Sequence, residues 1–196
     1  MPAPLAPEAL DQLFRAARTH NGWQPRAVPE ALLHQLYDLL KWGPTSMNCC
    51  PARFVFVTSA AGKERLRPCL SPGNVEKTLA APACVIIATD SRFYDHLPEL
   101  FPAYDARPGM LANPDKAAAT AQRNGTLQGA YLILAARALG LDVGPMSGFD
   151  AARLDAEFFP DGRWHANFLA NLGYGDPAQL HPRGPRLEFA RAAQIV

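Results

Sequence analysis

The segment from Ala117 to Leu139 constrains the fold more than any other part of this chain. Its polar and apolar residues alternate at helical spacing, and Gly140 follows where a helix is expected to stop. Small residues recur along it, at Ala117 to Ala119, Gly125 and Gly129. One stripe is apolar and consists of Leu127, Ala130, Tyr131, Leu134 and Ala138. We therefore expect a long helix that is either central to the domain or part of a dimer contact.

The remaining periodicity predicts a mixed α and β chain around this helix. Amphipathic helices are expected at 7–18 and 29–41, and shorter ones at 60–70, 74–80, 150–158 and 187–193. Strands are expected at 53–58, 83–89 and 166–174, where β-branched, aromatic and other apolar residues cluster. The proline-rich stretch 97–114 reads as an irregular surface excursion. With 196 residues and 48% hydrophobic content, we expect a single domain, 1–196.

Composition excludes several classes of function. The net charge of +1 provides no global field for nucleic acid or an anionic membrane. We find neither a signal segment nor a long apolar run, so we expect a cytoplasmic protein that does not bind membranes. The four cysteines lack metal-ligand spacing, so we expect no metal site and four reduced thiols. The alternative is that Cys49 and Cys50 are redox-active.

Hydrolase, P-loop and dinucleotide motifs are absent from the sequence. What remains is a set of loops with small polar residues at 18–22, 43–48, 73–77 and 144–148, and a basic pair, Arg183 and Arg186. Such loops can bind a planar heterocycle and a phosphate. Taken singly, however, these residue types are also ordinary in turns and helix caps. The residues alone therefore predict a domain that could bind a ligand and do not identify the ligand.

The order of these motifs resembles the nitroreductase family. The matching elements, in the order of the chain, are Arg18-Thr19, the segment Lys41–Asn48 with Pro51, Asn74 and Lys77 before Ala81-Pro82, Ala138–Leu141 leading to Pro145–Asp150, Asn171–Tyr174 and the C-terminal basic pair. The segments 18–23, 41–46 and 144–150 further resemble the RutE type of malonic semialdehyde reductase, a subgroup also called NADH dehydrogenase/NAD(P)H nitroreductase.

The resemblance implies an α+β fold, with a mostly antiparallel central sheet flanked by helices. It also implies a two-fold homodimer with FMN bound at the interface, and NADH or NADPH as co-substrate. The implied phosphate contacts are Arg18, Thr19, Asn21, Arg183 and Arg186. The residues implied to approach from the partner subunit are Pro44, Thr45, Ser46 and Asn48. Asn74 and Lys77 are implied near the ribityl chain and the pyrimidine edge of the flavin. Those implied along the ring are Pro145, Met146, Ser147 and Gly148.

Three positions depart from the family pattern. Asn21 stands where a second basic residue is common, Ser147 stands where an acidic residue is common, and the C-terminal basic pair is spaced differently. These departures affect individual contacts to the FMN phosphate and to the flavin atom N5, more than flavin binding itself. The hydride chemistry belongs to the flavin. No protein acid is evident as a proton donor, which leaves water or a flavin proton as the source.

The expected activity is reduction of a small molecule, malonic semialdehyde to 3-hydroxypropionate in pyrimidine catabolism. Arg107 is a candidate contact for the substrate carboxylate, although a surface role is the alternative. Two other functions remain open. One is a broad-specificity NAD(P)H nitroreductase or quinone reductase, and the other is a flavin-binding protein without turnover.

Overall fold

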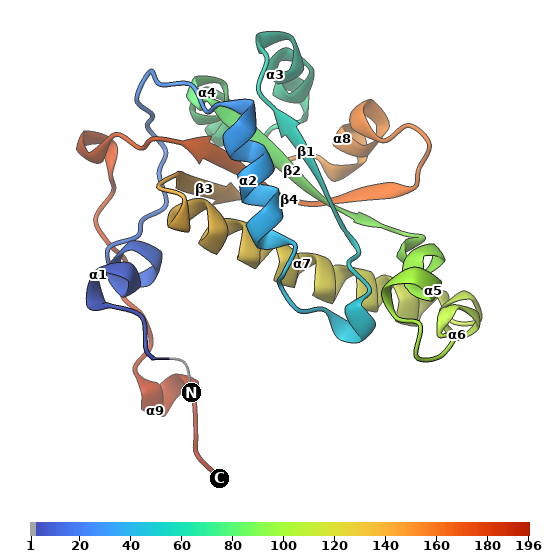
Figure 1. Cartoon of the computed structure of the whole chain (residues 1–196). Coiled ribbons are helices and arrows are strands. Elements are labelled where there is room, and N and C mark those ends of the chain that lie inside the picture. The colour runs from blue at the N-terminus through green and yellow to red at the C-terminus, as the bar shows by residue number, and fades with distance from the viewer. Residues whose placement is uncertain (1–2) are drawn as a thin grey trace.

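A four-stranded antiparallel sheet forms the centre of the molecule, for which a computed structural model describes residues 3–196 (Figure 1). The strands are β1 (Ala52–Val57), β2 (Ala83–Asp90), β3 (Asp142–Met146) and β4 (Trp164–Gly173). Their order is β1-β2-β4-β3, so that β2 and β4 are the inner strands. The α+β class and the antiparallel sheet expected from the sequence are confirmed.

Helices cover both faces of the sheet (Figure 1). The helices are α1 (Pro7–Leu10), α2 (Glu30–Leu40), α3 (Ala60–Leu66), α4 (Pro72–Ala80), α5 (Leu97–Leu100), α6 (Arg107–Leu111), α7 (Pro114–Ala138), α8 (Ala151–Phe158) and α9 (Phe189–Ala192). α2 and α7 pack on one face, whereas α3 and α8 pack on the other. As a result, every residue of β2 is buried.

Successive residues of β2 enter different cores, because side chains alternate across a strand. Val85 and Ile87 pack with α2 and α7, whereas Cys84 and Ile86 pack with α3 and α8. Full burial of one such aliphatic side chain contributes about 1.5–3 kcal/mol. The continuous apolar run seen in the sequence is thus explained by a strand that is covered on both sides.

α7 begins earlier than predicted, because Asn113 caps it and Pro114 occupies its first turn. The Asn113 side chain accepts a hydrogen bond from the Lys116 N–H at 3.0 Å. Gly140, with φ of 77°, follows the end of the helix as expected. Gly129 faces the sheet, where an added Cβ would lie 2.5 Å from the Phe168 ring. The small residues of α7 therefore let it pack closely on the sheet.

The structure corrects four further expectations. β3 was not predicted as a strand because Gly144 and Pro145 indicate a loop, yet an edge strand tolerates proline on its unpaired side. The predicted helix 7–18 divides into α1 and a π-helical segment, Asp11–Arg15, in which the Ala16 N–H donates to the Asp11 carbonyl. The remaining two concern the excursion and the tail.

The excursion 97–114 was expected to be irregular, but it is partly helical, with only residues 101–106 and 112–113 outside helices. It contains α5 and α6, each with a proline in its first turn, where the missing N–H costs nothing. Phe93, Leu97 and Met110 are buried there against the first turns of α7. At the other end of the chain, the helix predicted at 187–193 is the single turn α9, and residues from 182 onward are exposed.

Candidate functional site

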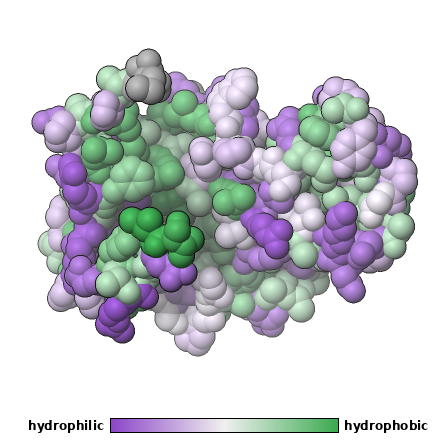
Figure 2. Space-filling view, turned by 90° about the horizontal axis from the view of Figure 1, so that it is seen from below, coloured by the Kyte–Doolittle hydropathy of each residue, from purple (hydrophilic) through white to green (hydrophobic). Residues whose placement is uncertain are grey.

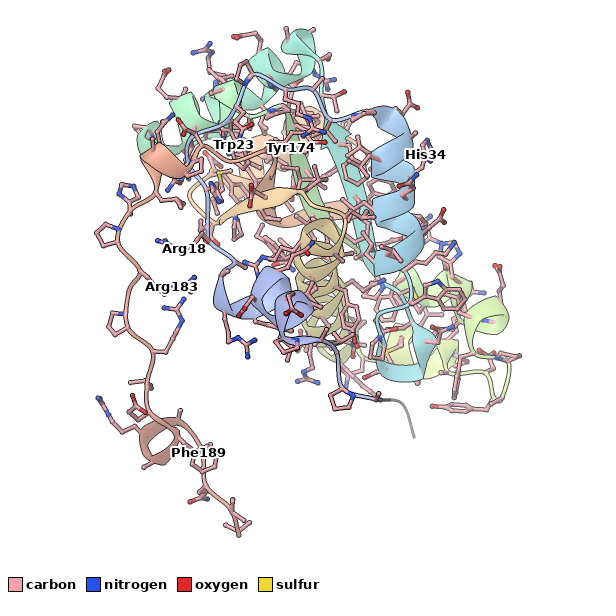
Figure 3. All side chains as sticks on the ribbon, turned by 60° about the vertical axis from the view of Figure 1, so that its left-hand side comes forward. Arg18, Trp23, His34, Tyr174, Arg183 and Phe189 are labelled. Carbon is pink, nitrogen blue, oxygen red and sulfur yellow. The ribbon has the colours of Figure 1, made fainter. Side chains whose placement is uncertain are left out.

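Arginine side chains converge on one cavity of about 450 Å³ at the C-terminal end of α7. We call this cavity the arginine pocket, and it is lined by Phe14, Ala17, Arg18, Thr19, Asn21, Arg137, His181, Pro182, Arg183, Gly184 and Arg186. Figure 3 shows Arg18 on the N-terminal segment and Arg183 on the C-terminal tail pointing into the space between them. The sequence prediction that these two basic segments lie together is consistent with this geometry.

Backbone carbonyls hold the arginines in place. The Arg18 guanidinium donates to the His181 carbonyl, and Arg183 donates to the Ala17 carbonyl at 2.8 Å. Arg186 donates to the carbonyls of its own turn, at Gly184 and Pro185, at 3.0 Å. These neutral acceptors orient the guanidinium groups but leave their positive charge uncompensated.

Thr19 joins this pocket to β3 through a parallel bridge with Val143. Asn21 then extends the site, because its side-chain oxygen accepts from the Lys77 ammonium group at 3.2 Å. Burial lowers the pKa of Lys77 below its ordinary value of 10.5. The lysine is thus a partly desolvated cation beside the arginine pocket.

Asn74 and Gly148 form the next part of the surface. The Asn74 amide donates to the Gly148 carbonyl at 2.7 Å, and the Ser71 N–H donates to the same carbonyl at 3.0 Å. The Met146 side chain is buried and its sulfur accepts from Thr78, so Met146 presents only its backbone at this edge. Ser147 is exposed and Pro145 is half-buried.

A second region, residues 43–50, lies elsewhere, and we call it the Ser46 loop. Met47, Asn48 and Cys50 have positive φ values of 53°, 49° and 39°, which are uncommon for residues other than glycine. Thr45 accepts from the Cys50 N–H at 3.2 Å, and Asn48 donates to the Leu100 carbonyl at 3.0 Å. Pro44 and Ser46 are exposed.

The two regions are far apart within one chain. The Ser46 N–H donates to Asn124 of α7 at 2.8 Å, whereas Arg137 of the same helix lines the arginine pocket. Between Asn124 and Arg137 the helix axis advances about 20 Å at 1.5 Å per residue. A single copy therefore does not bring Thr45, Ser46 and Asn48 to the other predicted site residues.

Arg107 lies at the start of α6, on the side of the Ser46 loop. Its guanidinium is 3.7 Å from the Asp95 carboxylate, and its side chain is 45% exposed. Asp95 also pairs with Arg92 at 3.0 Å. A contact between Arg107 and a substrate stays a prediction.

Arg137 is the arginine of the pocket that sequence reading missed. It stands in the last turn of a long helix, where a basic residue is ordinarily explained by the helix dipole. Its Nε is buried without a hydrogen-bond partner among residues 3–196. The only sequence signal for the pocket was the recurrence of arginines near loops. That signal marked the two ends of the chain and did not mark Arg137.

Other parts of the surface offer less chemistry. A cavity of about 600 Å³ between α2 and β1 is lined by Val28, Glu30, Leu33, His34, Tyr37, Phe56 and Thr58, and includes none of the predicted residues. Figure 3 shows His34 on the far side of the molecule from Arg18. Across residues 3–196 no cluster of metal-ligating side chains occurs, and no helix in that range has the length and apolarity to span a bilayer.

The fold is an α+β domain with an arginine pocket beside the Lys77 surface, and sequence comparison identifies its family. Residues 1–174 match the Nitroreductase family model, so the chain belongs to the nitroreductase family. A relative from Rhodopseudomonas palustris named "Putative NADH dehydrogenase/NAD(P)H nitroreductase" is 60% identical over 187 residues, with 95% of each chain covered. A relative of the same name from Stutzerimonas stutzeri is 57% identical over the full length of both chains.

Solved structures agree on the fold. A protein from Exiguobacterium sibiricum described as a "putative nitroreductase in complex with FMN" superposes with a TM-score of 0.86 at 19% identity, with 100% of both chains covered. A protein from Bacillus subtilis described as "putative nitroreductase ydfN" superposes with a TM-score of 0.84 at 18% identity, covering 96% of this chain and 99% of that one. At these identities the likeness establishes the fold alone.

Proposed function

We propose that this protein is an FMN-dependent oxidoreductase that uses NADH or NADPH. The observation that carries the proposal is the continuity of the arginine pocket with Asn21, Lys77 and Asn74. This surface offers guanidinium groups for a phosphate at one end, and amide and ammonium donors for a heterocycle at the other. The buried, unpartnered Nε of Arg137 fits an anionic ligand in the pocket. The FMN complex of a fold neighbour and the names of the relatives support the same proposal.

Bound FMN would supply hydride transfer, and the chain would supply orientation and charge. Arg18, Thr19, Arg183 and Arg186 would hold the phosphate. Lys77 would stabilise negative charge on the pyrimidine edge, because a partly desolvated cation acts more strongly than one in water. Asn74 would orient the same edge, and the Pro145–Gly148 backbone would lie along the ring.

A homodimer would complete this site. The Ser46 loop lies about 20 Å from the arginine pocket along α7, so Thr45, Ser46 and Asn48 would have to come from a second copy. Apolar surface for association is available in each copy. Leu127 on α7 is 45% exposed, and Phe189 on the tail is 63% exposed. Figure 2 shows apolar side chains gathered around a hollow on the underside, on the side of α1 and the tail.

The proposed substrate is malonic semialdehyde, which would take up a hydride and a proton to give 3-hydroxypropionate in pyrimidine degradation. The resemblance of segments 18–23, 41–46 and 144–150 supports this choice. No side chain is assigned to the proton, so water would supply it. Arg107 would meet the substrate carboxylate, and Arg107→Ala should raise KM for the semialdehyde while nitroaromatic reduction is unchanged.

A broad-specificity NAD(P)H nitroreductase is the second candidate. The names of relatives that are more than half identical to this chain favour it directly. It shares the cofactor and the site and differs only in the acceptor.

An anaerobic stopped-flow experiment tests the proposal. The flavin-loaded protein is reduced with NADH or NADPH, and malonic semialdehyde, menadione or a nitroaromatic is then added while flavin absorbance is followed. Rapid reoxidation by the semialdehyde supports the first candidate. Reoxidation by the quinone or nitroaromatic alone supports the second, and failure of both nucleotides to reduce the flavin rejects both.

A further inference from the structure

Arg137 is tied to the N-terminal segment by two hydrogen bonds. Its Nη1 donates to the Leu13 carbonyl at 2.9 Å, and its backbone carbonyl accepts from the Gln12 amide at 2.7 Å. It belongs to α7, which packs on the sheet, whereas Arg183 and Arg186 belong to the exposed tail. Arg137 is therefore a pre-positioned donor.

Without a bound anion, burial of the Arg137 charge in this environment costs free energy. Burial lowers the pKa of Arg137, the Asp142 carboxylate opposes that effect, and the positive charge of Arg183 adds to it. Asp142 is already engaged, since it accepts from the Gly175 N–H at 2.8 Å and faces His20 at 3.3 Å. Within residues 3–196, none of the four pocket arginines has a carboxylate within salt-bridge distance.

We propose that Arg137 is a phosphate-binding residue of the cofactor site and the one that makes it select a phosphorylated flavin over an unphosphorylated flavin. The inference rests on the proposed function. A phosphate carries a charge of about −1.5 to −2 at neutral pH, which matches an uncompensated cluster of guanidinium groups. The unpartnered Arg137 Nε would donate one hydrogen bond to it. In this arrangement Arg137 supplies the positive charge that is missing at Asn21, the position where a second basic residue is common in the family.

The test is equilibrium binding of FMN and of riboflavin, which differ only in the phosphate, followed by flavin fluorescence. Arg137→Gln should raise the Kd for FMN at least about tenfold, with the Kd for riboflavin changed less than about twofold. Arg137→Lys, which keeps the charge, should restore part of the FMN affinity. Arg153→Gln removes an exposed arginine on α8, away from the pocket, and should change neither Kd.

Gln12→Ala separates a binding role from a structural one. It breaks the hydrogen bond between the N-terminal segment and the Arg137 carbonyl without altering the guanidinium. If Gln12→Ala weakens FMN binding as much as Arg137→Gln does, or if Arg137→Gln weakens both flavins equally, Arg137 acts only through folding and the inference is overturned. A wild-type protein that binds neither flavin would overturn the proposed function itself, and the inference with it.

Discussion

The arginine pocket and the Ser46 loop differ in how the chain builds them. The pocket gathers side chains from the N-terminal segment, α7 and the tail, so one copy assembles it from parts distant in sequence. The Ser46 loop is local, and its shape depends on positive φ values at Met47, Asn48 and Cys50. Such backbone conformations cost about 1–3 kcal/mol each and persist only where surrounding structure holds them. The pocket is thus defined by charge and the loop by backbone shape.

The largest effect is expected when the two regions are inactivated in separate copies. Arg18→Ala with Arg183→Ala removes charge from the pocket, and Ser46→Trp places bulk on the exposed loop. Each variant alone should lose FMN retention. Coexpression should restore about a quarter of the sites, because half of randomly paired two-fold dimers would have one intact site.

Flavin absorbance per protein after gel filtration measures this restoration. Two results would refute shared sites. One is full flavin retention by Ser46→Trp alone, and the other is no recovery on coexpression although mixed dimers are detected by mass spectrometry.

A smaller effect is expected at the exposed face of α7. Leu127→Glu places a charge at a position that we expect to be buried between copies, which should weaken the dimer by about 2–4 kcal/mol. Light scattering across a dilution series measures the dimer Kd. Lys116→Glu, near the start of the same helix, is the control. An unchanged Kd for Leu127→Glu would place the interface on another surface.

Substitution of Asp90 should destabilise the Ser46 loop and leave the arginine pocket unaffected. Asp90 is buried and pairs with Arg53 at 2.7 Å and Arg163 at 2.9 Å, and Arg53 also donates to the Cys50 carbonyl. Asp90→Asn should cost about 2 kcal/mol of unfolding free energy, a value reduced because Arg163 is one-third exposed. Hydrogen exchange should rise at residues 45–50 and stay constant at residues 137–143.

The pH dependence of that cost follows from the Asp90 carboxyl. Burial raises its pKa, but hydrogen bonds from Arg163 and Arg92 and the charge of Arg53 outweigh burial and hold it below the ordinary 3.8. The stabilisation is therefore present above pH 3.8 and is lost as the pH falls through the lower, folded-state pKa. Denaturation of wild type and Asp90→Asn should converge in that acidic range, and a constant difference would contradict this assignment.

The smallest effect concerns the thiols. Burial, with a further contribution from Cys50, raises the pKa of Cys49 to about 11, and burial raises that of Cys84 to about 12. Cys50 is partly exposed, so iodoacetamide at neutral pH should label it first. Peptide mass spectrometry measures the order, and rapid labelling of Cys84 would contradict its buried position. Normal turnover in a Cys49→Ser, Cys50→Ser variant would argue against a redox role.

Sequence reading recovered the elements whose signal is local. The period of α7 and the apolar run of β2 follow directly from burial on one or both sides. β3 was missed because pairing with β4 is a long-range property that Gly144 and Pro145 obscure. The helices of the excursion were missed because prolines in a first turn look like prolines in a loop.

The candidate site divides in the same way. The resemblance supplied Arg18, Lys77 and Arg183 because they belong to ordered motifs. Arg137 belongs to no motif, and only the folded chain brings the end of α7 beside the tail. That the Ser46 loop lies at a distance from the pocket likewise depends on the position of each segment along α7.

The exposed tail has a consequence for how long the protein survives in the cell. Near the pocket, the tail is joined to the rest of the protein by the hydrogen bonds of Arg18 with His181 and of Arg183 with Ala17. A ligand that binds Arg183 and Arg186 would also hold the tail in place, because binding to the ordered form shifts the equilibrium toward that form. Trypsin, which cuts after arginine, should therefore cleave the tail of the flavin-free protein sooner than that of the flavin-loaded protein. In the cell, proteases acting on the same exposed tail would remove copies that had failed to acquire their cofactor.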